Sequence, residues 1–91
     1  MALVWPAKDP NEVLDYQIDW TKRLDGDTIS TSTYSVAVGT AVVDSSSKTT
    51  TTSTVWLSGG TLDETCEILN RVVTAGGRTF DQTVRVKIKA K

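Results

Sequence analysis

The chain has 91 residues, a formal charge of −1, no histidine and one cysteine, and this inventory already excludes several classes of protein. The length allows one domain. The absence of histidine removes the commonest general base and zinc ligand, and the lone Cys66 cannot close an intramolecular disulfide. The near-neutral charge gives no electrostatic signature for nucleic acid or an anionic membrane. Fifteen Thr and eight Ser favour strands and turns, so we expect an all-β protein that is not an enzyme.

The first 12 residues are predicted to form an irregular arm, ahead of a single domain over residues 13–91. Both prolines, Pro6 and Pro10, lie in this segment, and proline lacks the backbone donor that a strand needs. Trp5 of this arm either folds back across the domain or inserts into a neighbouring molecule. The segment shows no secretory signal and the chain no apolar run that would span a membrane, so we expect folding in a cytoplasm.

The next segment, residues 14–20, alternates apolar and polar side chains and is predicted to be a strand with one buried face. Trp20 shares the parity of the apolar residues and is expected in the core, whereas Asp25-Gly26-Asp27 is expected to be a turn. A second strand is predicted over residues 28–38. Ile29 is out of phase with the later apolar residues of this strand, which indicates a bulge near Thr31–Thr33.

The middle of the chain is predicted to contain a short strand at residues 41–43, a loop at residues 45–48 and a strand over residues 49–57. Trp56 is out of phase with its apolar neighbours Val55 and Leu57, so it can face solvent or a partner.

Two long runs in the last third, residues 66–73 and 80–88, are joined by a short Gly-Gly connection and predict a β-hairpin. Cys66 falls on an apolar parity and is expected to pack in the core. No stretch shows convincing helical periodicity.

Two rows of charge follow from the alternation of the first and last strands. Arg85, Lys87, Lys89 and Lys91 line one face of the last strand, and Asp15 and Asp19 line the polar face of the strand at residues 14–20. One hypothesis makes these rows neighbours, within one molecule or across a subunit contact. The alternative is two solvated faces that discourage edge-to-edge pairing.

Turn signals every 8–12 residues between short strands are typical of a β-sandwich or a small barrel. We predict an immunoglobulin-like β-sandwich of six to seven antiparallel strands. No catalytic, cofactor or metal site is expected: Asp25-Gly26-Asp27 lacks the ligands of a calcium loop, and the two Gly-Gly pairs do not match a phosphate loop.

Five segments, found in this order over nearly the whole chain, resemble the small fibre–tail adaptor or virion structural proteins of tailed bacteriophages and prophages. They are Trp5-Pro6-Ala7-Lys8-Asp9-Pro10, Leu14-Asp15-Tyr16 with Ile18-Asp19-Trp20, Gly26-Asp27-Thr28-Ile29, Val55-Trp56-Leu57-Ser58-Gly59-Gly60-Thr61 and Gly77-Arg78-Thr79-Phe80-Asp81. The resemblance implies an immunoglobulin-like sandwich that joins other virion proteins and catalyses nothing.

The resulting functional prediction is a virion adaptor that is assembled in the host cytoplasm and contacts tail or fibre proteins. A homo-oligomer, in which copies of the chain contact one another, is a further option. It needs no cofactor, nucleic acid or membrane. The expected contact residues are Trp5, Trp56, Gly76, Gly77 and Arg78. The alternative is a ligand-binding module in which Trp56, near Gly59-Gly60, stacks on a sugar ring.

Overall fold

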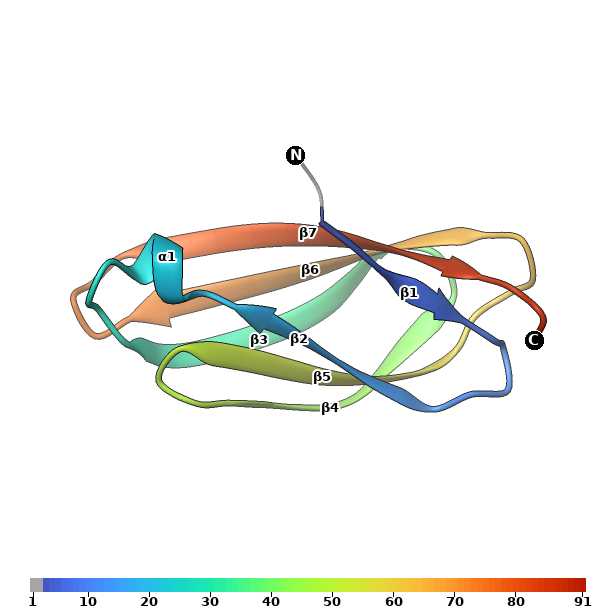
Figure 1. Cartoon of the computed structure of the whole chain (residues 1–91), viewed down its shortest axis with the longest axis horizontal. Coiled ribbons are helices and arrows are strands. Elements are labelled where there is room, and N and C mark those ends of the chain that lie inside the picture. The colour runs from blue at the N-terminus through green and yellow to red at the C-terminus, as the bar shows by residue number, and fades with distance from the viewer. Residues whose placement is uncertain (1–2) are drawn as a thin grey trace.

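Seven β-strands and one turn of helix make up residues 3–91, which this computed structural model describes (Figure 1). The elements are β1 Leu3–Lys8, β2 Leu14–Asp19, α1 Thr21–Leu24, β3 Ile29–Val38, β4 Ala41–Lys48, β5 Thr52–Gly59, β6 Thr65–Thr74 and β7 Thr79–Ile88. The prediction of an all-β sandwich is therefore confirmed.

The strands form two sheets, one of four strands in the order β1-β7-β6-β3 and one of three in the order β2-β5-β4. Alternate residues of each strand point between the sheets, as the sequence periodicity predicts. The central strands supply side chains with no exposed surface, among them Val55 and Leu57 from one sheet and Ile68, Val84 and Val86 from the other. The predicted hairpin is formed by β6 and β7, which pair antiparallel from Thr65 opposite Lys87 to Val73 opposite Thr79.

The prediction of an irregular arm is wrong for residues 3–8, because these residues form the strand β1 (Figure 1). β1 pairs parallel with β7, so the expectation of antiparallel strands is also wrong for this pair. Pro6 is tolerated because β1 is an edge strand and its register is irregular between Trp5 and Lys8. Residues 1 and 2, with which the predicted arm begins, lie outside the described residues.

The prediction of a loop at residues 45–48 is also wrong, because β4 continues to Lys48 and pairs with β5. Cross-strand pairing overrides the weak strand preference of this Ser-rich segment. The turn lies instead at Thr49–Thr51, where the Thr49 hydroxyl accepts hydrogen bonds from the backbone N–H groups of Thr51 and Thr52.

Two smaller features complete the chain path. A register irregularity between Ile29 and Thr31 agrees with the predicted bulge, but it lies just before the expected range Thr31–Thr33. The single turn of α1, which the periodicity did not predict, ends at Asp25 with a left-handed φ of 48°. A four-residue turn is too short for an apolar repeat to reveal it.

The predicted contact between the two charged rows within one molecule is wrong. Asp15 belongs to β2, in the three-stranded sheet, whereas Arg85 belongs to β7 in the other sheet. The Arg85 guanidinium instead lies 3.8 Å from the Glu67 carboxylate on the adjacent β6. β1 occupies the position beside β7 that the hypothesis gave to the strand at residues 14–20.

Cys66 is buried at the start of β6, as predicted, and burial raises the pKa of its thiol. Its sulfur lies under the β3–β4 turn so closely that a Cβ atom on Gly39 would sit 2.5 Å from Sγ. Gly39 also has a φ of 106°, so both space and backbone conformation require glycine here.

Candidate contact surface

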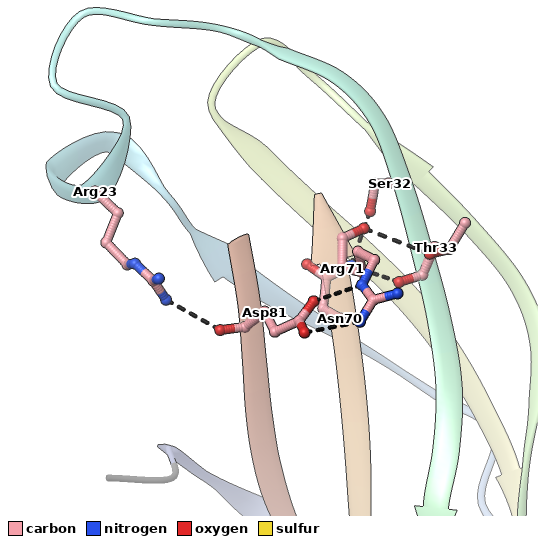
Figure 2. Close-up of polar contacts among 6 residues, drawn as sticks. All are labelled: Arg23, Ser32, Thr33, Asn70, Arg71 and Asp81. Atoms are coloured by element: carbon pink, nitrogen blue, oxygen red, sulfur yellow. Dashed lines mark hydrogen bonds and ion pairs between the residues drawn. The ribbon is translucent and has the colours of Figure 1, made fainter. Parts of the chain in front are cut away.

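A buried polar cluster between the sheets fixes their relative position. The Trp20 indole N–H donates to Asn70 Oδ1 at 3.0 Å and to Ser53 Oγ at 3.2 Å. The Asn70 amide donates to Ser32 Oγ and to the Thr33 carbonyl, both at 2.9 Å (Figure 2). Because Ser53 lies on β5 and Asn70 on β6, these bonds join the two sheets at one register.

The cluster is complete, since every buried side-chain nitrogen and oxygen in the described residues has a hydrogen-bond partner. Tyr34 closes it from β3 through a 2.7 Å hydrogen bond between its hydroxyl and Ser53 Oγ. The structure confirms the prediction that Trp20 is a core residue, whereas sequence reasoning missed the role of Asn70. The available signal was a polar residue on the parity of Ile68 and Val72, which in a buried strand requires partners.

The outer side of the three-stranded sheet carries an exposed aromatic side chain at its centre. Trp56 lies on β5, opposite Asp15 of β2 and Ser45 of β4, and 43% of its surface is exposed. We name this surface the Trp56 face. Its outward residues are Asp15, Gln17 and Asp19 from β2, Val42, Asp44, Ser45 and Ser47 from β4, and Thr52, Thr54, Trp56 and Ser58 from β5.

Apolar and acidic groups accompany Trp56 on this face. Val42, opposite Ser58, is 52% exposed, and Val13, immediately before β2, is 55% exposed. The ionisable side chains that point outward from the three strands are all carboxylates. Lys48 of β4 does not share this side, because it lies opposite the inward-facing Ser53 of β5. The face therefore combines an aromatic centre, apolar neighbours and negative charge.

Trp5 lies inside the domain, which corresponds to the first of its two predicted alternatives. Its ring stacks on Tyr16 with centroids 4.7 Å apart, and its indole N–H donates to the Gln17 carbonyl at 3.3 Å. Only 9% of its surface is exposed. Within this chain Trp5 therefore closes the gap between the edges β1 and β2 and leaves little surface for another molecule.

The hairpin tip, Gly76–Arg78, is held by the turn that follows α1. The Gly76 N–H donates to Asp27 Oδ1 at 3.1 Å, the Arg78 guanidinium pairs with Asp27 Oδ2 at 3.2 Å, and it donates to the Leu24 carbonyl at 2.6 Å. A Cβ atom on Gly76 would lie 2.6 Å from the Asp27 carboxylate. Gly76 and Arg78 are thus held by Asp27, whereas Gly77, whose N–H donates to the Thr74 carbonyl at 3.0 Å, is exposed.

The hydroxyl of Thr74 is the strongest influence on Asp27, followed by the Thr28 N–H, and with Arg78 and Gly76 these donors lower its pKa to about 2. Carboxylates that accept several hydrogen bonds are stabilised in the ionised form. This end of the sandwich is therefore fixed by polar contacts at neutral pH.

A buried lysine is another unusual ionisable group. Lys8 at the end of β1 has no exposed surface, and its ammonium donates to the Gly59 carbonyl at 2.6 Å and the Asp9 carbonyl at 2.9 Å. Burial lowers its pKa. These bonds join β1 to the end of β5, so Lys8 fixes the edge strand against the opposite sheet.

Residues 3–91 contain no group of three or more potential metal-binding side chains, and no helix in that range is long and apolar enough to cross a membrane. The fold defines the class of protein, a small all-β sandwich domain with one sheet face that presents an aromatic side chain among carboxylates and hydroxyls.

Comparison with known families then places the chain within this class. It belongs to the family described as podophage GP4 fiber-tail adaptor protein gp77, whose model matches residues 8–87. The predicted resemblance to phage fibre–tail adaptors is thereby confirmed. No curated protein matches the chain. The name of the family describes a phage structural protein, a fibre–tail adaptor.

Proposed function

We propose that this chain is a non-enzymatic virion component that joins tail and fibre proteins, and that the Trp56 face is the surface with which it binds a neighbouring subunit. Assembly in the host cytoplasm, without cofactor, nucleic acid or membrane, is part of this proposal. The observation that carries it is the exposed indole of Trp56 at the centre of a sheet face. The family membership supports the adaptor role.

Trp56 has the properties of an interface anchor. Tryptophan is enriched in the small set of residues that dominate binding energy, and it is most effective when its neighbours exclude water. Val13 and Val42 supply apolar surface beside it, and Ser58 and Asp44 supply a polar rim. Within the described chain the Trp56 indole N–H donates to no protein group, so it is free to donate to a partner.

The other predicted contact residues take a secondary place in this proposal. The arm contributes through Leu3 and Val4, which are exposed, rather than through the buried ring of Trp5. At the hairpin tip, Gly77 and the partly exposed Arg78 offer only a small additional surface.

The immunoglobulin-like relationship also belongs to this proposal. Immunoglobulin sandwiches place their second, fifth and fourth strands in one sheet and their third, sixth and seventh in the other. The order β2-β5-β4 against β7-β6-β3 agrees with that arrangement. β1 lies parallel to β7 instead of beside β2.

The test is incorporation into particles by a phage whose own copy of the gene is deleted and supplied in trans. Wild-type protein is expected in purified virions, Trp56→Ser is expected to be depleted, and Leu62→Ser is the matched control because Leu62 is exposed in a loop outside the Trp56 face. Normal incorporation of Trp56→Ser would overturn the assignment of the surface. Absence of the wild-type chain from virions would overturn the function.

The carbohydrate-binding alternative predicts a different result. The exposed indole of Trp56 is a suitable platform for a sugar ring. Selective binding on a glycan array that is lost in Trp56→Ser, together with normal incorporation of this variant, would favour that alternative.

A further inference from the structure

We propose that the subunit bound to the Trp56 face is a second copy of this chain, docked through the outer side of its four-stranded sheet. This inference rests on the proposed function, because it names the partner of the same surface. The charges and the apolar residues of the two outer sheet faces support it.

The Trp56 face is negative. Asp15 and Asp19 on β2 and Asp44 on β4 point outward, and the described residues place no cation within ion-pair distance of these three carboxylates. Asp15 is the cross-strand partner of Trp56, so negative charge lies directly beside the aromatic anchor. A partner that covers this face must supply positive charge, because two like-charged surfaces repel.

The opposite face of the molecule supplies such charge. Arg85 and Lys87 point outward from β7, and Lys89 continues the same alternation. Arg85 has only a long 3.8 Å contact with Glu67, and Lys87 donates to the backbone carbonyl of Asp63. The positive charge of this row is therefore incompletely compensated within the chain.

The remaining charges of the four-stranded sheet cancel. Arg71 on β6 makes a two-point ion pair with Asp81 on β7, at 2.8 and 2.9 Å (Figure 2). This pair lies toward the hairpin tip, whereas the Arg85 row lies toward the C-terminus. We name the surface of Val4, Glu67, Leu69, Thr83, Arg85, Lys87 and Lys89 the Arg85 face. Its three cations outnumber the carboxylate of Glu67, so the face is positive.

The apolar groups of the two faces also match. Val4 is 74% exposed and lies beside Arg85 in the register of β1 with β7, and Leu69 is the cross-strand partner of Thr83. Each face thus combines apolar groups with charge, Trp56 with Val42 on one, and Val4 at the sheet edge and Leu69 on β6 on the other. Sheet faces pack together at about 10 Å when their outward side chains interdigitate.

The two faces belong to opposite sheets of one sandwich and cannot meet within a molecule. Contact between the Trp56 face of one copy and the Arg85 face of the next is head-to-tail, so a bound pair still presents one free Trp56 face and one free Arg85 face. Such contacts produce closed rings or open chains, according to the rotation between neighbours. Contact between two Trp56 faces would instead oppose carboxylates to carboxylates.

The experiment is sedimentation velocity of the full chain over a range of concentrations, at low and at high salt. Wild type is expected to self-associate at low salt and to lose this association at high salt, since exposed charges are screened there. Asp15→Lys/Asp44→Lys and Arg85→Glu/Lys87→Glu are each expected to associate at least about tenfold more weakly. Ala75→Lys, at the hairpin tip, is the control for added positive charge outside both faces.

Mixing the two reversed variants is the decisive measurement. An equimolar mixture is expected to associate again, because the lysines of one variant meet the glutamates of the other. Association of the separate variants at wild-type strength, or no gain on mixing, would overturn the proposal. A monomeric wild type at every low-salt concentration would also overturn it, while the proposed function stands so long as Trp56→Ser remains depleted from virions.

Discussion

Trp20 and Trp56 both belong to the three-stranded half of the sandwich, but they lie on opposite faces of its sheet. Trp20 faces the core between the sheets, and Trp56 faces outward. Trp20, at the end of β2, is 1% exposed, and its N–H is shared by Asn70 and Ser53. Its ring stacks on Phe80 and lies 5.2 Å from the Arg23 guanidinium. Trp56 points to the other side of the sheet and is largely free of such contacts within the described chain.

The difference shows what each surface requires. Between the sheets, an unpaired polar group costs about 1–3 kcal/mol, so the cluster around Trp20 must be complete in the isolated chain. On the outer face water satisfies the same groups, so the surface around Trp56 can remain open until a partner covers it. The interior determines the fold, and the outer face is available for assembly.

Replacing each tryptophan by alanine gives the largest expected separation between the two surfaces. Trp20→Ala is expected to lower the free energy of unfolding by about 4 kcal/mol, because it removes a large buried ring and leaves a cavity. Trp56→Ala is expected to cost less than about 1 kcal/mol, as is usual for an exposed position. Urea unfolding followed by circular dichroism measures both.

Trp20→Phe keeps the comparison testable even when the alanine variant does not fold. It retains most of the ring and removes the N–H donor, with an expected cost of about 1–2 kcal/mol. Equal destabilisation by Trp20→Ala and Trp56→Ala would contradict the division between interior and outer face.

Asn70→Ala tests the polar half of the interior. It removes the acceptor of Trp20 and the donor to Ser32 and Thr33, with an expected loss of about 2–3 kcal/mol in unfolding free energy. Asn11→Ala, in the turn before β2, is the matched control, because only the backbone of Asn11 makes a hydrogen bond there. A loss as small as that of the control would show that the cluster adds no stability.

The sequence predicts the strands better than their partners. The period of two placed Trp20, Val55 and Leu57 correctly because it depends only on which side of a strand each residue faces. It could not show that β1 lies beside β7, since pairing depends on the competition of all edges for partners. The prolines of the arm gave the wrong answer because they penalise a central strand far more than an edge.

The candidate contact surface was predictable in part for the same reason. Trp56 stands out of phase with Val55 and Leu57, and this phase identified an outward aromatic residue. The role of Asp27 in holding Gly76 and Arg78 joins residues about fifty positions apart, which no local pattern reveals. Asn70 required knowledge of which polar residues the opposite sheet would bring near it.

The interior cluster also predicts the response to alkaline pH. Burial raises the pKa of Tyr34 to about 12 from 10.0, and Tyr16 is raised to about 12 as well. The unfolded chain loses these protons first, so the stability they contribute is full below pH 10 and is lost as pH rises to about 12. Absorbance of tyrosinate from the folded protein is therefore expected near pH 12 rather than near pH 10. Titration of either residue near pH 10 in the folded protein would contradict its burial.

The smallest expected effect concerns the turn that contains Asp27. Like the buried cluster around Trp20, the carboxylate of Asp27 accepts several hydrogen bonds. The pKa of Asp27 is lowered to about 2 from 3.8, first by the Thr74 hydroxyl. A lowered pKa in the folded state means that the unfolded chain takes up the proton first, so the stabilisation is present above pH 3.8 and is lost as pH falls to about 2. Asp27→Asn is therefore expected to be less stable than wild type at neutral pH and to converge with it near pH 2. Thermal unfolding across this range measures the convergence, with Asp25→Asn, in the same turn, as the control. Parallel pH profiles for wild type and Asp27→Asn would show that the hairpin tip is held by packing rather than by this carboxylate.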